Sequence, residues 1–311
     1  MIKNKRAILI AGPTASGKSE TALKVAEALQ GEIINTDSMQ VYKGLDIIVA
    51  QPKESDLEKA PHALYGFRDP AKSFSVARWM EEAKKAADGA WENGHIPIFI
   101  GGTGLYFKAL VDGISDIPEV PEHIKLSLDR RLKTEGLEAL YHELEDFDPE
   151  IAGQLKPNDK QRVLRALCVY QATDKTLSFW QTQKKKPVLG GVSLLKVVLQ
   201  SPPEELNEKI LKRLKKMLDQ GALGEVRTFQ ERKLNPSLPA TKALGLRPLL
   251  RHLAREVSIN EALELAVIET RQYAKRQRTW FRNQFQDWYP VAAGESAADK
   301  ILSLAKTQFK D

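Results

Sequence analysis

Short apolar runs alternate with longer amphipathic stretches in the first hundred residues of the chain. The stretches 19–29 and 76–94 place apolar residues at helical spacing, and Ser75 stands as an N-cap before the second one. Strands that alternate with helices are typical of parallel crossover connections. We therefore predict an α/β fold with a parallel sheet covered on both faces. Its expected strands are residues 7–12 (AILIAG), 32–37 (EIINTD), 96–102 (IPIFIGG) and 194–200 (LLKVVLQ).

A long helical pattern interrupts the sheet. Residues 116–187 are helical in pattern throughout and bounded by prolines, which predicts an inserted all-helical subdomain. After residue 203 the chain is helical again, and Ser258 and Glu261 have the spacing of a capping box. Residues 43–73 are expected to form a loop, and the end of the chain a terminal helix. The predicted parts are a first part of the core, 1–115, a helical insertion, 116–189, and a return to the core with basic C-terminal helices, 190–311.

Composition and charge narrow the class of protein only slightly. The 311 residues carry a formal net charge of +6, a balance that fits a polyanionic partner but is weak by itself. The single cysteine, Cys168, cannot form a disulfide within the chain and is expected to be a buried apolar residue in a reducing compartment. No apolar run reaches the ~20 residues of a membrane helix, and the first residues are too polar for a signal peptide. We expect a cytoplasmic protein that does not associate with membranes.

The strongest motif is the segment Gly12-x4-Gly17-Lys18-Ser19, which has the P-loop pattern. It lies after a predicted strand and opens a predicted helix, which is the context that the motif requires. Backbone N–H groups and the helix dipole would point at an anion, and Lys18 would reach the terminal phosphate. The Ser19 hydroxyl is the candidate ligand for Mg²⁺. This pattern predicts a bound phosphate chain but does not name the molecule that carries it.

A carboxylate at a strand end is the next candidate. A P-loop NTPase usually has a second strand of four apolar residues followed by a magnesium-binding Asp, and no such run is present in the sequence. The acidic residue after a strand is instead Asp37. Ligands of parallel sheets bind beyond the carboxyl ends of the strands, so Asp37 should face the crevice of the P-loop. It is either a general base for an incoming nucleophile or only the start of a turn.

Two further residues could belong to the same crevice. The segment 101–106, GGTGLY, ends a predicted strand, and its glycines would let the backbone approach a ligand while Thr103 offers a hydroxyl group. A tight strand-to-helix turn without a function explains the segment as well. Arg78, one turn into a helix, is a phosphate ligand or a solvated surface charge. The scattered histidines lack the spacing of zinc ligands, so we predict no zinc site.

The segment 271–282, RQYAKRQRTWFR, contains five basic residues and no acidic one. On a helix, one face of this segment carries basic residues, while another carries apolar residues that should be buried. A basic face of this kind suits an RNA phosphate backbone, although a solvated surface would have the same pattern. We call the residues Arg271, Lys275, Arg278 and Arg282 the basic face. The apolar face consists of Ala274, Phe281, Phe285 and Trp288.

Taken in order, seven short blocks resemble one family. They are GPTASGKSE, INTDSMQVYKGLDI, SVARW, GGTGLY, QRVLRAL, KALGLR and AKRQRTWFR, and they span residues 12–282. Together they are similar to the bacterial tRNA dimethylallyltransferases. The resemblance implies a P-loop α/β core with a helical insertion. It also implies transfer of a five-carbon prenyl group from dimethylallyl diphosphate to N6 of the adenosine immediately 3′ of the anticodon, which is tRNA position 37.

What the resemblance implies for the site can be stated by residue. Asp37 would accept a proton from N6, Thr103 would assist, and Lys18 with Mg²⁺ would stabilise the leaving diphosphate. The base would be unstacked from the anticodon loop of the tRNA. The implied diphosphate-binding residues are Gly12, Pro13, Thr14, Ala15, Ser16, Gly17, Lys18, Ser19 and Arg78. The implied tRNA-binding residues, with the basic face added, are Asp37, Ser38, Met39, Gln40, Thr103, Gln161, Arg162, Val163, Leu164, Arg165, Lys242, Ala243, Leu244, Gly245, Leu246 and Arg247.

One stretch departs from the family pattern. Members of the family commonly have GTAKP and PHHLID where this chain has IVAQP (48–52) and PHALYGF (61–67). Gln51 therefore stands in place of a lysine, which removes the contact that such a side chain would make. The P-loop, Asp37 and Thr103 are intact, so activity is expected.

Three other functions remain open. An adenylate isopentenyltransferase shares the P-loop and the aspartate, but it acts on a free nucleotide and needs neither the insertion nor the basic face. A small-molecule kinase would turn over ATP, and the missing strand with a terminal Asp counts against it. An RNA-binding module without catalysis would leave Asp37 as a turn residue. We predict a monomer without an obligate protein partner, since tRNA alone can cover the basic surface.

Overall fold

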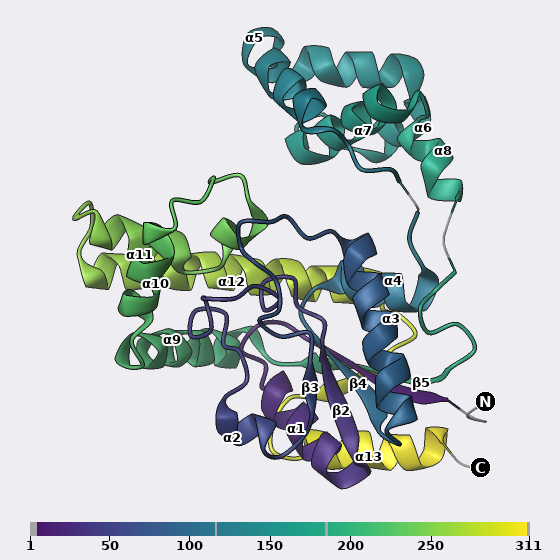
Figure 1. Cartoon of the computed structure of the whole chain (residues 1–311), viewed down its shortest axis with the longest axis vertical. Coiled ribbons are helices and arrows are strands. Elements are labelled where there is room, and N and C mark those ends of the chain that lie inside the picture. Colours follow the sequence, from purple (N-terminus) through teal and green to yellow (C-terminus); the bar gives the residue numbers. More distant parts are fainter. Residues whose placement is uncertain (1–4, 116, 184–185, 310–311) are drawn as a thin grey trace. The chain divides into compact units, whose positions relative to one another are not determined.

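The computed structural model describes residues 5–115, 117–183 and 186–309 of the chain. It divides into two compact units, residues 1–111 with 188–311 and residues 112–187 (Figure 1). Among the described residues, the helices are all too short or too polar to cross a membrane.

The first unit is built on a parallel sheet, which has six strands within the described residues, in the order β3-β2-β4-β1-β5-β6. The two central strands β4 and β1 align Gly101 with Ala11 at their carboxyl ends. The segments that follow these strands therefore meet at one edge of the sheet, and the predicted α/β fold is confirmed. The strands are β1 (Arg6–Ala11), β2 (Gly31–Asn35), β3 (His62–Ala63), β4 (Ile96–Gly101), β5 (Ser193–Gln200) and β6 (Tyr289–Ala292).

The predicted strands differ from the observed ones in two ways. The strand expected at 32–37 ends at Asn35, which leaves Asp37 in the following turn. The outer strands β3 and β6 were not predicted, because β3 has two residues and β6 contains Pro290, a residue that sheets tolerate at their edges. The expected loop 43–73 therefore contributes β3 and a short helix, α2 (Glu54–Leu57).

Helices cover both faces of this sheet, as predicted. The helices α1 (Lys18–Leu29) and α13 (Ala297–Gln308) pack together on one face, where a shared apolar cluster includes Ile8 and Ile98. On the opposite face α3 (Val76–Glu92) packs on β2 and β4, and Ser75 caps it through the Arg78 N–H group (Figure 1).

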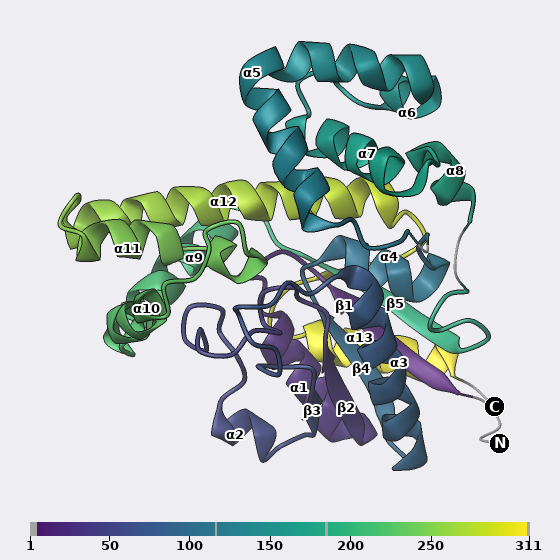
Figure 2. The same ribbon diagram turned by 45° about the horizontal axis from the view of Figure 1, so that its top comes forward.

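A group of helices lies beside the sheet. It consists of α9 (Pro203–Asp219), α10 (Ala222–Glu231), the 3₁₀ turn η1 (Pro239–Lys242), α11 (Leu246–Leu253) and α12 (Ile259–Gln284). Figure 2 shows α12 as its longest member, running alongside α11. Ser258 and Glu261 form the predicted capping box at its start. The predicted burial of Ala274, Phe281, Phe285 and Trp288 is confirmed, but the helix ends at Gln284, so Phe285 and Trp288 follow it and stack after its end rather than on its face.

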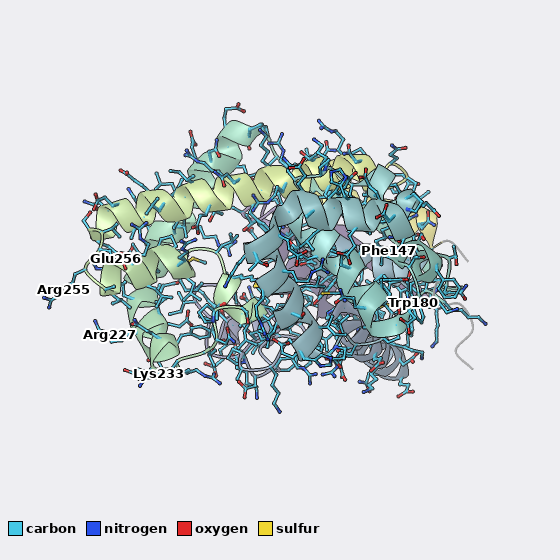
Figure 3. The ribbon with its side chains drawn as sticks, turned by 90° about the horizontal axis from the view of Figure 1, so that it is seen from above. Phe147, Trp180, Arg227, Lys233, Arg255 and Glu256 are labelled. Carbon is cyan, nitrogen blue, oxygen red and sulfur yellow. The ribbon has the colours of Figure 1, made fainter. Side chains whose placement is uncertain are left out.

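The second unit is helical and has its own core, which includes Cys168. Phe147 stacks on Tyr170 with ring centroids 4.1 Å apart, and the Trp180 indole N–H donates to Thr173 Oγ1 at 3.0 Å (Figure 3 labels Phe147 and Trp180). Gly136, with φ of 86°, interrupts the first helix of this unit. The helices are α5 (Glu122–Phe147), α6 (Pro149–Gln154), α7 (Lys160–Thr173) and α8 (Leu177–Thr182), and α4 (Gly104–Asp112) precedes them.

Candidate active site

The P-loop connects β1 to α1 in the predicted place. Its backbone turns through two left-handed residues, Ala15 with φ of 62° and Gly17 with φ of 81°. Gly17 is also the N-cap of α1, so the free N–H groups of the first helical turn lie next to the loop. Alternating conformations of this kind turn successive N–H groups toward one point and form an anion-binding concavity. The loop therefore has the backbone shape that a phosphate requires.

Lys18 is held close to this loop. Its Nζ donates to the Pro13 carbonyl oxygen at 2.8 Å. Burial lowers the pKa of Lys18 to about 8, while the carboxylate of Asp37 opposes this shift and the guanidinium of Arg213 adds to it. The charges of Asp37 and Arg213 therefore act directly on Lys18, although the three residues come from different parts of the chain.

Asp37 lies in a turn that Asn35 fixes. The fully buried Asn35 accepts from the Asp37 N–H at 2.8 Å through Oδ1, and its Nδ2 donates to the Asp37 carbonyl oxygen at 3.0 Å. The Asp37 carboxylate accepts from the Met39 N–H at 2.9 Å, as in an Asx turn. The predicted turn is thus present, and the role of Asp37 as a general base stays a prediction.

The turn after β4 lies against the turn that carries Asp37. Thr103 Oγ1 accepts from the Ser38 N–H at 3.0 Å and donates to Ser38 Oγ at 3.3 Å. A Cβ atom on Gly101 would collide with the Thr36 carbonyl, which explains the glycine at this position. Gly12 N–H donates to the Gly101 carbonyl oxygen at 3.3 Å, so the P-loop also contacts this turn. The predicted residues Asp37, Ser38 and Thr103 therefore lie together.

Arg213 of α9 belongs to the site and was not predicted. Its Nη1 donates to Thr14 Oγ1 at 3.2 Å, and burial lowers its pKa while Asp37 opposes the change. It lines a pocket of about 770 Å³ together with residues 15–19 of the P-loop. The sequence contains a signal for this position, because Lys209, Arg213 and Lys216 recur on one face of a helix and all three line the pocket.

The buried part of α12 was missed as well. The Thr14 N–H donates to Gln277 Oε1 at 2.9 Å, and Gln277 Nε2 donates to the Gly102 carbonyl oxygen at 2.9 Å. Tyr273 lies one turn before Gln277 on the same side of the helix, and burial raises its pKa. A polar residue on the buried side of a basic helix has no distinctive spacing, so no signal in the sequence alone pointed to Gln277.

The outer residues of the predicted site are either exposed or already engaged within the fold. Arg78 is exposed in the first turn of α3, and its part in phosphate binding stays a prediction. Gln40 Nε2 donates to the carbonyl oxygens of Val49 and Ala50 at 3.0 and 2.7 Å, so this amide already fixes a loop. Gln51, which replaces the family lysine, likewise donates to the Tyr42 carbonyl oxygen at 2.9 Å.

The predicted RNA-binding stretches contain both exposed and buried residues. Every residue of the basic face is exposed on α12. Lys242 and Arg247 are exposed and line a second pocket of about 780 Å³. In contrast, Val163 is fully buried in the core of the second unit, and Leu246 is fully buried in the first unit. The side chains of these two residues support their helices, and RNA contacts remain a prediction for their exposed neighbours.

A bound metal would need ligands beyond the protein. Among the described residues there is no group of three or more His, Cys, Asp or Glu side chains that could hold a metal ion. Ser19 is exposed in the first turn of α1, where its hydroxyl group is accessible. Mg²⁺ commonly takes one or two protein ligands and completes its shell with phosphate oxygens and water. The residues present therefore fit a metal that arrives with a diphosphate.

The fold and site together define an α/β protein of the P-loop class in which two half-buried cations, Lys18 and Arg213, lie at the loop, and Asp37 and Thr103 lie on two turns that contact each other beside it. A family model described as IPP transferase matches residues 40–284. A second one, described as isopentenyl transferase, matches residues 5–65. The chain belongs to the IPP transferase family, and the predicted resemblance is confirmed.

Relatives and solved structures agree with this assignment. A tRNA dimethylallyltransferase of Beijerinckia indica subsp. indica is 47% identical over 91% of this chain and 93% of its own length. One of Bartonella henselae is 45% identical over 92% and 99%. The full-length tRNA isopentenylpyrophosphate transferase of Bacillus halodurans has a TM-score of 0.69 at 30% identity, over 98% of this chain and 95% of that one. A eukaryotic dimethylallyltransferase acting on tRNA has a TM-score of 0.78 at 30% identity, over 98% and 77%.

Proposed function

We propose that this chain transfers the dimethylallyl group of dimethylallyl diphosphate to N6 of the adenosine immediately 3′ of the anticodon of tRNA, and releases diphosphate. One observation carries the proposal. The P-loop and the turn of Asp37 both contact the end of β4 and the turn that follows it, since the Gly12 N–H donates to the Gly101 carbonyl oxygen at 3.3 Å and the Ser38 N–H donates to Thr103 Oγ1 at 3.0 Å. A proton acceptor and a cradle for a leaving diphosphate therefore lie on adjoining loops, as a prenyl transfer between phosphate and amine requires.

The P-loop side of the crevice, which we call the donor side, would hold the diphosphate. The bond between C1 of the prenyl group and the diphosphate oxygen breaks, and the electron pair leaves with the diphosphate. The N–H groups of the loop, Lys18 and Arg213 would stabilise that growing negative charge, which is a large source of rate acceleration in such sites. To do so, Lys18 exchanges its bond to the Pro13 carbonyl for one to a phosphate oxygen.

The turns that carry Asp37 and Thr103, which we call the acceptor side, would hold the adenine. Its N6 is a weak nucleophile because the lone pair is delocalised into the ring. A carboxylate that accepts the N6 proton as the new bond to C1 forms makes this amine more reactive. Asp37 would accept that proton. Thr103, which is hydrogen-bonded to Ser38, would help to orient the adenine.

Mg²⁺, when bound to the diphosphate, would neutralise part of its charge. Ser19 is the protein residue that would hold this ion. A cytoplasmic location and a monomeric state also stay predictions, and light scattering that gives twice the mass of one chain would contradict the latter.

The alternative functions lack specific support. The match to isopentenyl transferases covers residues 5–65, which contain the P-loop and Asp37 that a nucleotide-acting enzyme would share. That match therefore does not distinguish the two acceptors. The match over residues 40–284 reaches through the exposed basic face, a surface that a free nucleotide does not need.

The test supplies radiolabelled dimethylallyl diphosphate and Mg²⁺ with either unmodified tRNA or AMP. Label should appear in tRNA and disappear when the adenosine next to the anticodon is replaced. Label in AMP alone would overturn the choice of acceptor. Label in neither, together with hydrolysis of ATP, would overturn the proposed reaction.

A further inference from the structure

Three side chains of α12 face the two loops of the site. Tyr273, Gln277 and Trp280 are spaced by four and three residues, which places them on one side of the helix. A Cβ atom on Gly104 would collide with the indole of Trp280, and Gln277 bonds to the carbonyl oxygen of Gly102. The helix that carries the basic face is therefore packed directly onto the turn that carries Thr103.

Gln277, at the centre of this group, joins the two sides of the crevice. Its side chain is only 6% exposed. Its Oε1 accepts from the N–H of Thr14 in the P-loop, and its Nε2 donates to the carbonyl oxygen of Gly102 after β4, both at 2.9 Å. A Cβ atom on Gly102 would collide with the same amide, so the backbone comes as close to it as a glycine permits. We call these two hydrogen bonds the Gln277 bridge.

The bridge needs both a donor and an acceptor at the end of one side chain. An amide supplies them, whereas a carboxylate lacks the donor, and a thioether lacks the donor and is only a weak acceptor. A buried amide that satisfies two backbone groups of different loops fixes the distance between those loops, because breaking either bond leaves a buried polar group without a partner. Both bonds come from one side chain of α12, so the position of this helix sets the positions of both loops.

We infer that Gln277 is a positioning residue. Its amide holds the P-loop and the Gly102–Thr103 turn at the relative position that brings the prenyl donor and the adenine acceptor together. This inference rests on the proposed function. Gln277 contacts neither reacting atom in this scheme. It acts through Thr14 on the donor side and through Gly102 on the acceptor side. A small misplacement of two reacting groups is enough to slow a reaction by about 10²-fold.

The kinetic test compares Gln277→Met, which keeps the length of the side chain and removes both hydrogen bonds, with the wild type. The matched control is Gln284→Met, the same exchange at the exposed last residue of α12. In Gln277→Met we expect kcat to fall about 10- to 100-fold, because the two substrates still bind but their reacting atoms are misplaced relative to each other. KM for dimethylallyl diphosphate and Kd for tRNA should stay close to the wild-type values, and Gln284→Met should match the wild type throughout.

A structural readout separates this inference from the proposed function. Hydrogen–deuterium exchange of the free protein should be faster in peptides that cover 12–19 and 101–106 in Gln277→Met. Gln277→Glu keeps the acceptor for Thr14 and removes the donor for Gly102. The increase in exchange rate should therefore be larger in the peptide that covers 101–106 than in the peptide that covers 12–19. This variant also decides the matter if Gln277→Met fails to fold.

The outcomes are distinct. Unchanged kcat, or unchanged exchange at both loops, would overturn the positioning role even if the wild type modifies tRNA. A loss of melting temperature and of both substrate affinities in step with kcat would show a residue that only stabilises the fold, and would overturn it too. A wild type that modifies no tRNA would refute the proposed function, while exchange would still show whether Gln277 holds the two loops.

Discussion

The donor and acceptor sides of the crevice are built from different kinds of bond. On the donor side, the shape of the P-loop comes from backbone conformation, with Ala15 and Gly17 in the left-handed region. On the acceptor side, side chains hold the turns, through Asn35 under Asp37 and Thr103 against Ser38. The difference means that a short motif can describe the shape of the P-loop, whereas the acceptor side also needs the contact between Ser38 and Thr103, which are 65 positions apart. Substitutions on the two sides should therefore produce separable defects.

The largest effect is expected at the acceptor side from Asp37→Asn. The amide has nearly the same shape but cannot accept the N6 proton, so kcat should fall by about 10³-fold. Affinity for dimethylallyl diphosphate should stay within a few-fold. Single-turnover kinetics and calorimetry measure the two quantities.

The control for this variant is Asp219→Asn, at the exposed end of α9, which should leave both quantities unchanged. An Asp37→Asn variant that retains the wild-type kcat would contradict the general-base role and leave Asp37 as a turn residue.

A smaller effect is expected at the donor side from Lys18→Met. Removal of one charge-assisted hydrogen bond should weaken diphosphate binding by about 10- to 100-fold. The affinity of the wild type should also depend on pH. Burial lowers the pKa of Lys18 to about 8, and the diphosphate needs the protonated form. Binding should therefore be constant below this pKa and weaken as the pH rises through it, by up to about tenfold per unit.

Calorimetric titration across this pH range measures the effect, and Lys24→Met, an exchange of an exposed lysine on α1, should behave as the wild type does. Binding that takes up no proton at pH values near the pKa of Lys18 would argue against its contact with the diphosphate. If the affinity of Lys18→Met still fell as the pH rises, the pH dependence would not come from Lys18, and this result would also argue against its contact with the diphosphate.

The smallest effect on chemistry is expected from the basic face, which lies outside both sides of the crevice. In the double variant Arg278→Ser and Arg282→Ser, the slope of log K against log salt for tRNA binding should decrease by about one for each phosphate that is no longer neutralised. The value of kcat at saturating tRNA should change little. Filter binding over a series of salt concentrations tests this, and an unchanged slope would place the RNA backbone elsewhere.

The sequence predicted the parts of this protein that depend on local pattern. The α/β fold, the helix that begins at the Ser258 capping box and the burial of the apolar residues in and after the last turns of α12 follow from periodicity and end signals, because these signals lie in consecutive residues. The strand β6 has four residues and, within the described part of the chain, pairs with β5 alone, so its existence depends on a neighbour rather than on its own pattern.

The same reasoning explains which site residues were predicted. The P-loop, Asp37 and Thr103 follow strand ends, and a parallel sheet necessarily brings such positions to one edge. Arg213 and Gln277 lie on helices beside the sheet, and they reach Thr14 only through the packing of those helices. That packing is set by tertiary contacts, so one sequence read alone could not place them.

The hydrogen bond between Thr14 and Gln277 spans 263 positions of the chain. During synthesis, the P-loop leaves the ribosome long before α12 does, but domains generally fold as units, and the unit that contains the P-loop also includes residues 188–311. The site should therefore be completed only after α12 has emerged, so that each newly made copy gains its full activity late in its synthesis.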